Sequence, residues 1–573
     1  MMRNNKKTAY IISLAIATAI IAMFSAPAAQ AAYEPPESTI IIGLYYGTTA
    51  LPSGNLQNAS GLGSGFEFGY YDGNRDFVPI GAWTDENSIS MVMDRNVAWH
   101  PGVGGGAGEY REGTSGSAVV GCFHILLEAN YETFEQAKEE ASQYNDSYVK
   151  FDSGQFFVMM SQYTTRAEAE NAIAARGLSG CRVEAGTSNT IAVVRTGTDR
   201  VLFEFDYGNT RYLGVRPRPI GDENPETIFK NSRYCGGFQY SRRDGALLTV
   251  INYVDIEDYV KGIIPYEMNN TWPIEALKAQ ACCSRTYAQA SLGKHSSQGF
   301  DLCTTEDCQV YRGRGEANER TDMAVDETAG MYVTYNGEIC TTFYASSNGG
   351  ASENIENVWS ETIPYLLGVI DPYEADVIPM IPNYYWTITY TPQQITQRLK
   401  NSGINCSTIV SMRVSAYTAT GNVLEIKMKD DRGVEYTFSK RERLYAALGV
   451  PTQRFNIGNA IYAPGSILVN DPLEALPPDS WIYVIDGNGE TIAVPRDRIY
   501  AITESGNIEA VTGEEGGSSG DDNGMVNGVF TIRGSGRGHS IGMSQWGAYS
   551  MAEYYGKTYE DIIKFYYSGV EIG

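Results

Sequence analysis

Glu267 stands at a point in the sequence where a single carboxyl group could act as an acid. The segment reads IIPYEMNNTWP: an amphipathic segment is expected to end at Pro265, and a helix is expected to start near Pro273. Burial in a break between Tyr, Met and Trp would raise the carboxyl pKa, and a Glu with a raised pKa can donate a proton near neutral pH. The alternative is that Glu267 caps or pairs with the following helix.

A histidine and two cysteines form a second candidate group. His295, Cys303 and Cys308 lie in KHSSQGFDLCTTEDCQVYRG, and the chain has only 4 His. Imidazole and thiolate suit Zn²⁺, and three protein ligands leave one position for water or a substrate. The spacing fits no standard zinc finger, and a Cys303–Cys308 disulfide is the alternative. The nearby His favours a metal site.

Two segments rich in small residues could bring backbone close to a bound molecule. FYASSNGGASENIENVW, at 343–359, follows a strand with a hydroxyl- and Gly-rich loop. GSGRGHSIGMSQWGA, at 534–548, presents His539 and Gln545 between a strand and a helix. It lacks the ending of a phosphate-binding loop, which excludes a nucleotide site. The alternative is a satisfied His539 beside Trp546.

Strong secondary-structure signals surround these segments. Residues 39–48 predict a buried strand, and 273–291 predict a helix with Pro273 in its first position and Gly293 at its end. Residues 421–450 are expected to form strands. Further elements are a strand at 526–533 and helices at 392–401, 543–555 and 558–566.

Residues 117–196 repeat a strand followed by a helix. Strand-like runs at 118–127, 155–160 and 191–194 alternate with helical runs at 133–141 and 166–175, which predicts a small βαββαβ module. With Ser161–Thr164 before a helix that opens at Ala167, the module resembles the sporulation-related repeat (SPOR) domain. That resemblance implies binding to peptidoglycan glycan strands without peptides. The alternative is an unrelated structural insert.

Residues 1–31 read as a secretory signal peptide. Arg3, Lys6 and Lys7 precede the apolar run 10–24, and Ala29–Ala31 offers small residues for cleavage. An uncleaved anchor helix is the alternative, but the run is short for a membrane span. Because no other long apolar run occurs, we expect an extracytoplasmic protein with no stable membrane span after cleavage.

The composition argues against nucleic acid as a partner. The 573 residues include 43 Lys+Arg and 68 Asp+Glu, a net charge of −25, whereas phosphate binding needs a basic surface. Hydrophobic residues at 43% exclude a disordered chain. The 40 Tyr and 61 Gly suggest a β-rich protein with aromatic faces for sugars or peptides. Nine scattered Cys do not form the framework of a small disulfide-bonded domain.

Four segments together resemble the SpoIID/LytB family. They are 259–287, 294–313, 342–359 and 537–548, and PYEM…WPIEALKAQA…SRTYA and GRGHSIGMSQWGA are the most specific motifs. The resemblance implies an α+β fold with a strand-rich body and few helices. The expected organisation is a signal peptide at 1–31, opening strands at 39–110, a SPOR-like domain at 117–196, and a catalytic domain at 197–573 with an insert at about 458–525.

The resemblance implies a peptidoglycan lytic transglycosylase of the cell wall, acting in wall remodelling or sporulation. Such an enzyme cleaves MurNAc–GlcNAc bonds and leaves 1,6-anhydroMurNAc ends. Glu267 matches the family's catalytic acid, and one carboxyl group would suffice where ordinary glycosidases use two. The family's zinc site maps onto His295, Cys303 and Cys308. Predicted substrate-binding residues are Arg285, Tyr287, Ser346, Ser347, His539 and Gln545.

Two other functions stay open at this point. Part of the family is described as non-catalytic peptidoglycan-binding or amidase-enhancing protein, so other cell-wall hydrolases are expected as partners beside the glycan strands. Intact Glu267 with an intact Cys/His set favours the enzyme. A Cys–His hydrolase using Cys303 with His295 or His539 is disfavoured, because no helix N-terminus or orienting partner is evident for that thiol.

Overall fold

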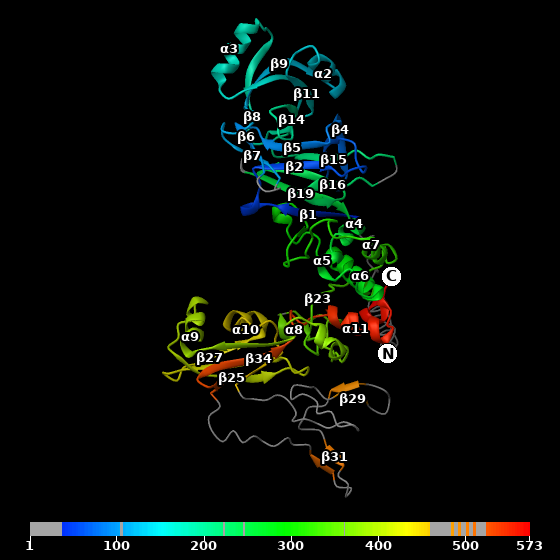
Figure 1. Ribbon diagram of the computed structural model, residues 1–573, viewed down its shortest axis with the longest axis vertical. Coiled ribbons are helices and arrows are strands. Elements are labelled where there is room, and N and C mark those ends of the chain that lie inside the picture. Colours follow the sequence, from blue (N-terminus) through cyan, green and yellow to red (C-terminus); the bar gives the residue numbers. More distant parts are fainter. Residues whose placement is uncertain are drawn as a thin grey trace, which may run out of the picture. The chain divides into compact units, whose positions relative to one another are not determined.

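The computed structural model describes residues 37–102, 107–221, 224–243, 247–359, 361–458 and 523–573, and the backbone of four short strands within 483–510 (Figure 1). The signal peptide expected at 1–31 and most of the insert expected at about 458–525 lie outside these residues. The described part is a strand-rich α+β fold, as the sequence predicts. None of its helices combines the length and the apolar character that crossing a membrane requires.

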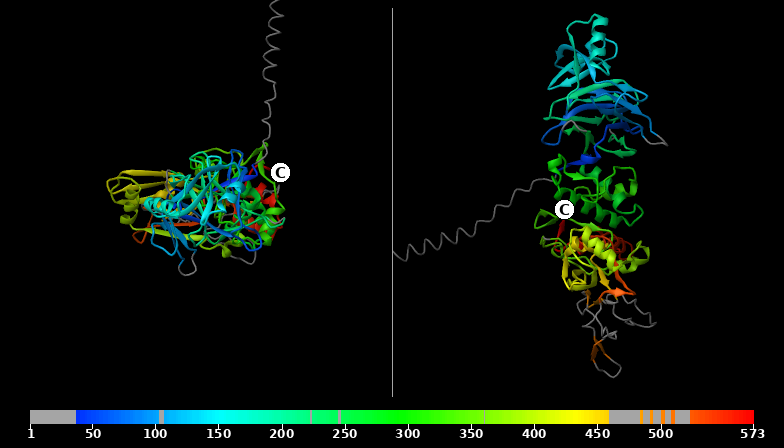
Figure 2. Two further views of the ribbon diagram at one scale, coloured as in Figure 1. Left: turned by 90° about the horizontal axis from the view of Figure 1, so that it is seen from above. Right: turned by 90° about the vertical axis from the view of Figure 1, so that its left-hand side faces the viewer.

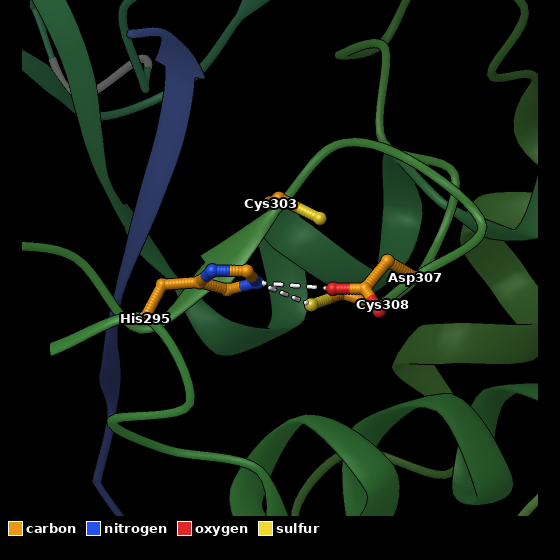
Figure 3. A group of neighbouring side chains, drawn as sticks. All are labelled: His295, Cys303, Asp307 and Cys308. Atoms are coloured by element: carbon orange, nitrogen blue, oxygen red, sulfur yellow. Dashed lines mark hydrogen bonds and ion pairs between the residues drawn. The ribbon is translucent and has the colours of Figure 1, made fainter. Parts of the chain in front are cut away.

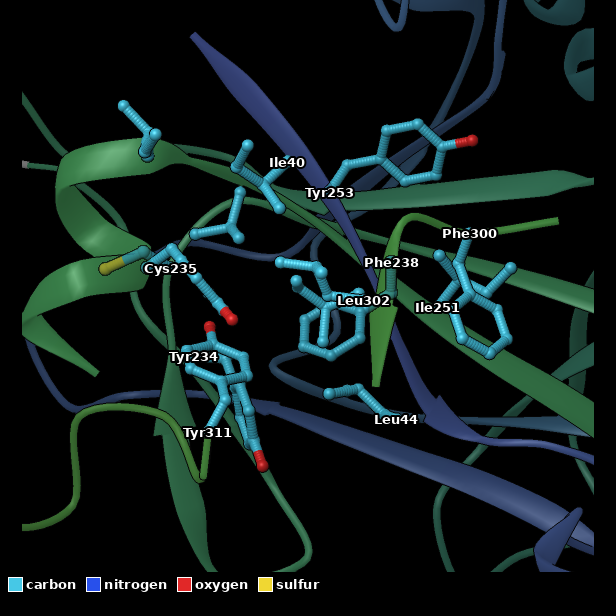
Figure 4. Packing of buried hydrophobic residues seen from close by; sticks show 14 of the residues in the cluster. Ile40, Leu44, Tyr234, Cys235, Phe238, Ile251, Tyr253, Phe300, Leu302 and Tyr311 are labelled. Atoms are coloured by element: carbon cyan, nitrogen blue, oxygen red, sulfur yellow. The ribbon is translucent and has the colours of Figure 1, made fainter. Parts of the chain in front are cut away.

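A seven-stranded sheet carries one predicted metal ligand, Cys303, at its edge. Strand β1 (Thr39–Tyr45) pairs in parallel with the edge strand β20 (Leu302–Cys303), and Gly43 lies opposite Cys303. Its other neighbour, β19 (Leu248–Asp255), is antiparallel to it. Every second residue of β1 is buried, and Ile40 and Leu44 face the core shown in Figure 4. Across the sheet the strands are β20 (Leu302–Cys303), β1 (Thr39–Tyr45), β19 (Leu248–Asp255), β18 (Gly237–Arg242), β15 (Leu213–Pro217), β3 (Phe66–Tyr71) and β4 (Phe77–Thr84).

A ten-stranded sheet contains the segment expected at 117–196. In order its strands are β12 (Cys181–Ala185), β9 (Phe123–Tyr131), β11 (Gln155–Tyr163), β10 (Ser147–Asp152), β14 (Val201–Asp206), β13 (Ile191–Arg195), β5 (Ser88–Met93), β2 (Ser53–Asn58), β16 (Thr227–Phe229) and β17 (Ser232–Tyr234). A smaller sheet joins β7 (Glu109–Glu112), β6 (Val97–His100) and β8 (Val119–Val120).

Helices α2 (Phe134–Ala141) and α3 (Arg166–Arg176) pack against β9 and β11 in this segment (cyan in Figures 1 and 2). Each begins at a Thr with a capping box, which explains why both helices start where the sequence predicts. The order β9-α2-β10-β11-α3-β12 has the expected βαββαβ form, but its last strand is β12. The run at 191–194, which the sequence suggests as the closing strand, is part of β13 and pairs with β14 and β5 instead. Since β10 pairs in parallel with β14, the sheet continues beyond the segment. Its identity as a SPOR-like domain stays a prediction.

Helix α6 (Ile274–Ala290) is the helix expected at 273–291, with Pro273 as its N-cap rather than its first residue. It packs against α7 (Glu319–Asp326), α11 (Gln545–Tyr555) and α12 (Tyr559–Tyr566). The remaining short elements here are α4 (Ile256–Lys261), α5 (Ile264–Glu267), α8 (Ile355–Val358), the 3-10 helices η1 (Gly47–Thr49), η3 (Ser296–Gln298) and η4 (Tyr373–Met380), and the strands β21 (Val333–Tyr335), β22 (Glu338–Ile339), β36 (Glu571–Ile572), β23 (Tyr344–Ala345) and β35 (Met543–Ser544).

A separate hydrophobic core lies among the later strands. It involves β24 (Tyr385–Tyr390), β34 (Val529–Ser535), β28 (Phe455–Ile457), β33 (Met525–Val526), β25 (Ile409–Tyr417), β26 (Val423–Asp430), β27 (Glu435–Ser439), α9 (Pro392–Asn401) and α10 (Lys440–Leu448). Two hairpins follow: β29 (Tyr483–Ile485) with β30 (Thr491–Ala493), and β31 (Tyr500–Ile502) with β32 (Ile508–Ala510).

Helix α10 corrects the expectation that residues 421–450 are all strand. Leu444, Ala447 and Leu448 recur at helical spacing and are buried in the core. Gly449 ends the helix in the left-handed conformation, with φ of 66°.

Candidate active site and metal centre

Glu267 is the last residue of α5. The chain turns from α4 into α5 at Gly262, where a Cβ atom would lie 2.5 Å from the ring of Tyr311. Pro265 stands in the first turn of α5, where its missing N–H removes no helical hydrogen bond. The helical segment therefore does not end at Pro265, as the sequence suggested. It continues to Glu267, and the break begins at Met268.

The Glu267 carboxyl group is half-buried and has two hydrogen-bond donors. The Val310 N–H donates to its Oε1 at 3.2 Å, and the Gln545 amide donates to the same carboxyl group. Burial raises the pKa of Glu267, the two hydrogen bonds oppose that rise because they favour the ionised form, and the charge of Glu306 adds to it. The net shift of the pKa is upward.

Amide and hydroxyl groups next to this carboxyl group are linked to one another by hydrogen bonds. Gln545 Nε2 donates to Gln280 Oε1 at 3.3 Å, and Gln280 donates to Ser284 Oγ at 3.0 Å. Gln309 Nε2 donates to the Tyr344 hydroxyl at 2.9 Å. Because Gln280, Ser284 and Gln309 are buried, these bonds act in a low dielectric and hold the surroundings of the carboxyl group in one arrangement.

Parallel pairing of β23 with β35 joins two loops that are far apart in the sequence. The Trp546 N–H donates to the Ser346 carbonyl oxygen at 3.1 Å, and Ser347 exchanges two backbone hydrogen bonds with Arg537. The predicted residues Ser346 and Ser347 therefore lie beside the start of α11, which Gln545 opens.

Glu374 is a buried acid that holds the loop around Ser347 and the start of α11 together. It accepts hydrogen bonds from the Ser347 hydroxyl at 2.9 Å, from the Asn348 N–H at 2.7 Å and from the Ser544 hydroxyl. Burial, followed by the charge of Asp371, raises the pKa of Glu374 to about 7. Since Ser347 is fully buried, its hydroxyl serves the loop rather than an exposed surface.

His539 packs beside Trp359, at 5.3 Å between ring centroids, and is half-buried. Its Nδ1 accepts the Ile541 N–H at 3.0 Å. Burial, with the positive charge of Arg441, lowers the pKa of His539 to about 4, so the imidazole is neutral at neutral pH. No hydrogen bond between described residues joins His539 to Glu267.

The three predicted metal ligands converge, and Asp307 joins them (Figure 3). One potential ligand atom from each of His295, Cys303, Asp307 and Cys308 lies within 4.8 Å of the other three. His295 Nε2 is 3.3 Å from Cys308 Sγ and 3.3 Å from Asp307 Oδ2. All nine cysteines are free thiols, so no Cys303–Cys308 disulfide is present.

The donor chemistry of this group fits a metal ion. One imidazole, two thiols and one carboxylate suit a tetrahedral Zn²⁺ site. The Cys308 thiol donates a hydrogen bond to Cys303 and lowers the pKa of the Cys303 thiol, against the effect of burial. One thiolate is therefore already favoured, and thiolates are the form in which cysteines bind metals.

Val310, which donates to Glu267, comes two residues after Cys308. The loop that a bound ion would hold thus also supplies a hydrogen bond to the candidate acid.

A comparison with known protein families matches the part of the chain that contains Glu267 and the metal-ligand candidates. Residues 244–335 match the SpoIID family model, described as Stage II sporulation protein, and this range includes Glu267 and the four metal-ligand candidates. Residues 244–335 of this chain therefore carry a segment similar to the SpoIID family.

Three relatives extend the match beyond that range. An uncharacterized protein of Brachyspira hyodysenteriae is 28% identical over 370 residues, covering 63% of this chain and 80% of the relative. The amidase enhancer of Bacillus subtilis is 28% identical over 340 residues, covering 55% of this chain but only 40% of the relative. Stage II sporulation protein D of Bacillus subtilis is 26% identical over 338 residues, covering 56% of this chain and 75% of the relative.

Two predicted substrate-binding residues lie in the interior. Arg285 is fully buried and donates to both carboxylate oxygens of Glu257, at 2.8 and 2.5 Å, and to the Met331 carbonyl oxygen at 3.2 Å. Tyr287 is 8% exposed, and its ring lies 5.8 Å from that of Phe343. The structure does not bring Arg285 into contact with Glu267, and its contacts suit a structural role.

Arg285→Ala is expected to lower the free energy of unfolding by about 3 kcal/mol, because it leaves the Glu257 carboxylate without its partner. Urea denaturation of the full chain measures the change. Arg320→Ala is the matched control, since the exposed Arg320 side chain donates to the Trp272 carbonyl oxygen. Unchanged stability with weakened glycan binding would instead support the sequence prediction for Arg285.

Several residues of the candidate site were not found by sequence reasoning. Asp307 gave no signal because an Asp in a polar loop is common, although it stands next to Cys308. Gln309 and Tyr344 meet only through the fold. Trp272, Trp546 and Tyr549 form a half-buried aromatic group, with ring centroids 4.6 to 5.6 Å apart, beside the segment that contains Glu267.

Proposed function

We propose that this chain is a peptidoglycan lytic transglycosylase that cleaves MurNAc–GlcNAc bonds to 1,6-anhydroMurNAc ends. The observation that carries the proposal is the half-buried Glu267 carboxyl group, whose pKa is raised and which receives the Val310 N–H and the Gln545 amide. A protonated carboxyl group in this setting is suited to acid catalysis near neutral pH.

Glu267 serves both proton transfers in the proposed reaction. It first gives its proton to the glycosidic oxygen as the bond to the MurNAc anomeric carbon breaks. The resulting carboxylate then takes the proton of the MurNAc C6 hydroxyl, whose oxygen bonds to the anomeric carbon and closes the ring. The two hydrogen bonds to Glu267 support the second role, because they stabilise the carboxylate between the two steps.

Substrate contacts are proposed on both sides of this acid. The half-buried rings of Trp272, Trp546 and Tyr549 offer apolar faces with polar edges, which suit sugar rings. The backbone at Ser346 and the neutral imidazole of His539 lie on the adjoining loops. Such contacts need no positive charge, which agrees with an acidic chain.

Zinc is the proposed ion for His295, Cys303, Asp307 and Cys308. When bound, it would supply a fixed cross-link within the 295–308 loop rather than a reacting group, because a site with four protein ligands is closed. The loop would then hold the Val310 N–H in place to donate its hydrogen bond to Glu267.

The proposed location is extracytoplasmic, at the cell wall, with residues 1–31 directing export and the βαββαβ segment binding glycan. Denuded glycan strands are the proposed ligand of that segment. Nucleic acid is not proposed as a partner.

The second candidate is a non-catalytic peptidoglycan-binding protein that stimulates another hydrolase. The name of one relative, the amidase enhancer, favours it. The two candidates differ in their products, since an enhancer alone releases no anhydro-ended fragments. A Cys–His hydrolase is not proposed, because the Cys303 thiol is buried among other potential metal ligands.

The deciding experiment incubates the full chain with purified glycan strands, with and without peptides, and determines the masses of the products. Anhydro-ended fragments are expected from the chain alone. If fragments appear only when an amidase is added, and none of them ends in an anhydro sugar, the enhancer is the better description.

Gln545→Leu is expected to move the alkaline limb of the pH–rate profile up by about one pH unit. A proton donor works while protonated, so the rate falls as the pH rises through the pKa of Glu267. Removing an amide that favours the carboxylate raises that pKa further. Gln57→Leu, at an exposed position of β2, is the control. A downward shift of the limb in Gln545→Leu would contradict the assignment.

A further inference from the structure

Three buried ionisable side chains meet far from Glu267 in sequence. Asp94 follows β5, His124 lies on β9 and Glu204 lies on β14. Their exposed fractions are 5%, 1% and 1%. The three residues come from before, within and after the βαββαβ segment, so the sequence alone gave no reason to group them.

The potential ligand atoms of these residues face one another. His124 Nε2 lies 3.0 Å from Asp94 Oδ1 and 3.4 Å from Glu204 Oε1. One ligand atom from each residue lies within 4.8 Å of the other two. Ligands bound about 2.0–2.2 Å from one Zn²⁺ ion stand about 3.0–3.5 Å apart, and both distances from His124 Nε2 fall in this range.

A single proton on His124 cannot serve both carboxylates well. One N–H directed at Asp94 leaves Glu204 Oε1 at a longer distance and off its axis. A divalent ion, in contrast, attracts both carboxylates together with the neutral imidazole. Asp94 Oδ2 and Glu204 Oε2 are also buried without a hydrogen-bond partner among the described residues. Such orphaned oxygens are costly unless a further group satisfies them.

A second layer of contacts orients the three side chains. The Tyr148 hydroxyl lies 2.7 Å from both Glu204 Oε1 and His124 Nδ1, and the Ser161 carbonyl oxygen lies 3.3 Å from the same ring nitrogen. Ser161 adopts a left-handed φ of 53° near a register shift in the pairing of β11 with β9. Metal-bound histidines characteristically direct the other ring nitrogen to such partners.

The neighbouring positive charges have hydrogen bonds and ion pairs with other groups. Lys150 is buried opposite Glu204 and its charge acts on that carboxylate, but its ammonium group lies 2.5 Å from Glu184 and 3.3 Å from Asp152. The Arg242 guanidinium, which acts on Asp94 at longer range, donates to the backbone carbonyl oxygens of Thr187 and Thr190. Two carboxylates therefore face one imidazole in the interior.

We propose that Asp94, His124 and Glu204 form a second metal site, which takes a divalent ion of the zinc type through one imidazole nitrogen and two carboxylate oxygens. The chemistry of the donor set excludes a soft, thiolate-seeking ion and fits Zn²⁺ or a neighbouring first-row ion. The site is structural, because all three ligands are buried and join β9 to β14 and to the end of β5. It would anchor the βαββαβ segment to the strands on either side of it.

The competing arrangement is an imidazolium between two carboxylates. Burial lowers the pKa of His124, but the charges of Glu204 and Asp94 together outweigh it and raise the pKa to about 9. The two arrangements differ in metal content, so metal analysis separates them.

The experiment loads the metal-free full chain with Zn²⁺, removes the excess and counts ions per chain. Two ions are expected in the parent, one in Cys303→Ser/Cys308→Ser, and one in Glu204→Gln. Glu204→Gln keeps the size of the side chain and its ability to accept from Tyr148. Asp206→Asn, another buried acid on β14, is the matched control and is expected to keep two ions. Two ions in Glu204→Gln, or one ion in the parent that disappears with the two cysteines, would overturn the proposal.

A second measurement avoids any variant of the new site. Co²⁺ added to Cys303→Ser/Cys308→Ser is expected to give weak visible absorption at one equivalent, without the intense near-ultraviolet band of cobalt–thiolate bonds. Absence of stoichiometric Co²⁺ binding in this variant, with its circular dichroism unchanged, would overturn the proposal as well. Neither readout depends on glycan cleavage.

Discussion

Glu267→Gln is expected to slow glycan cleavage about 10²- to 10⁴-fold, the range that a positioned acid–base group contributes. The amide keeps the size of the carboxyl group and its place beside Val310 and Gln545, but it can neither give a proton to the glycosidic oxygen nor take one from the C6 hydroxyl. Glycan binding should change little. Initial rates of anhydro-end formation and a separate binding measurement together check both expectations.

The matched control is Glu306→Gln. Glu306 is exposed and raises the pKa of Glu267 through its charge alone. Its neutralisation should therefore leave the chemistry intact and move the alkaline limb of the pH–rate profile slightly downward. Equal activity in the parent and in Glu267→Gln would disprove the role of Glu267. A loss in Glu306→Gln as large as that in Glu267→Gln would point to a two-carboxylate hydrolase instead.

Cys308→Ser is the second substitution with a large expected effect. The zinc content should fall by one ion per chain, because the substitution removes one of the two sulfur donors, which bind zinc more strongly than a hydroxyl group does. At zinc about 1,000 times its dissociation constant, the ion contributes about 4 kcal/mol to stability, which this variant should lose. The loop up to Val310 should also lose its anchor, so the rate of cleavage should fall with the stability.

Zinc analysis and thermal unfolding, each with and without added zinc, check this expectation. Cys340→Ser is the control, since Cys340 is an equally buried free thiol outside the ligand group. Asp307→Asn should weaken zinc binding less than Cys308→Ser. An unchanged zinc content in Cys308→Ser would refute the ligand assignment.

Local signals made much of the fold predictable. Thr391 caps α9 through a capping box, and the sequence-predicted bounds of that helix match the structure. Pro265 was misread because its effect depends on its place within a helix: it breaks an interior but suits a first turn. Helix α10 was missed because the helix is short, and its buried residues face a core that is partly built from distant strands.

The candidate site was predictable only where its parts are close in sequence. His295, Cys303 and Cys308 lie within fourteen residues, so spacing alone suggested a ligand group. The contact of Gln545 with Glu267 depends on the pairing of β23 with β35, which no local pattern encodes. The burial of Arg285 could not be foreseen, because its motif shows chemistry but not burial, and its partner Glu257 lies 28 residues earlier.

The pairing of β28 with β34 has a consequence for how this chain could have acquired accessory sequence. Gly458 donates its N–H to the Thr531 carbonyl oxygen at 2.8 Å, and a Cβ atom at Gly524 would lie 3.0 Å from Ile457 Cγ2. The chain therefore leaves this sheet and re-enters it at adjacent points. Sequence of almost any length can be spliced between such points at a small entropic cost that grows only with the logarithm of its length. A module could therefore be inserted, lost or exchanged at this position of the sheet while Glu267 and its partners keep their positions.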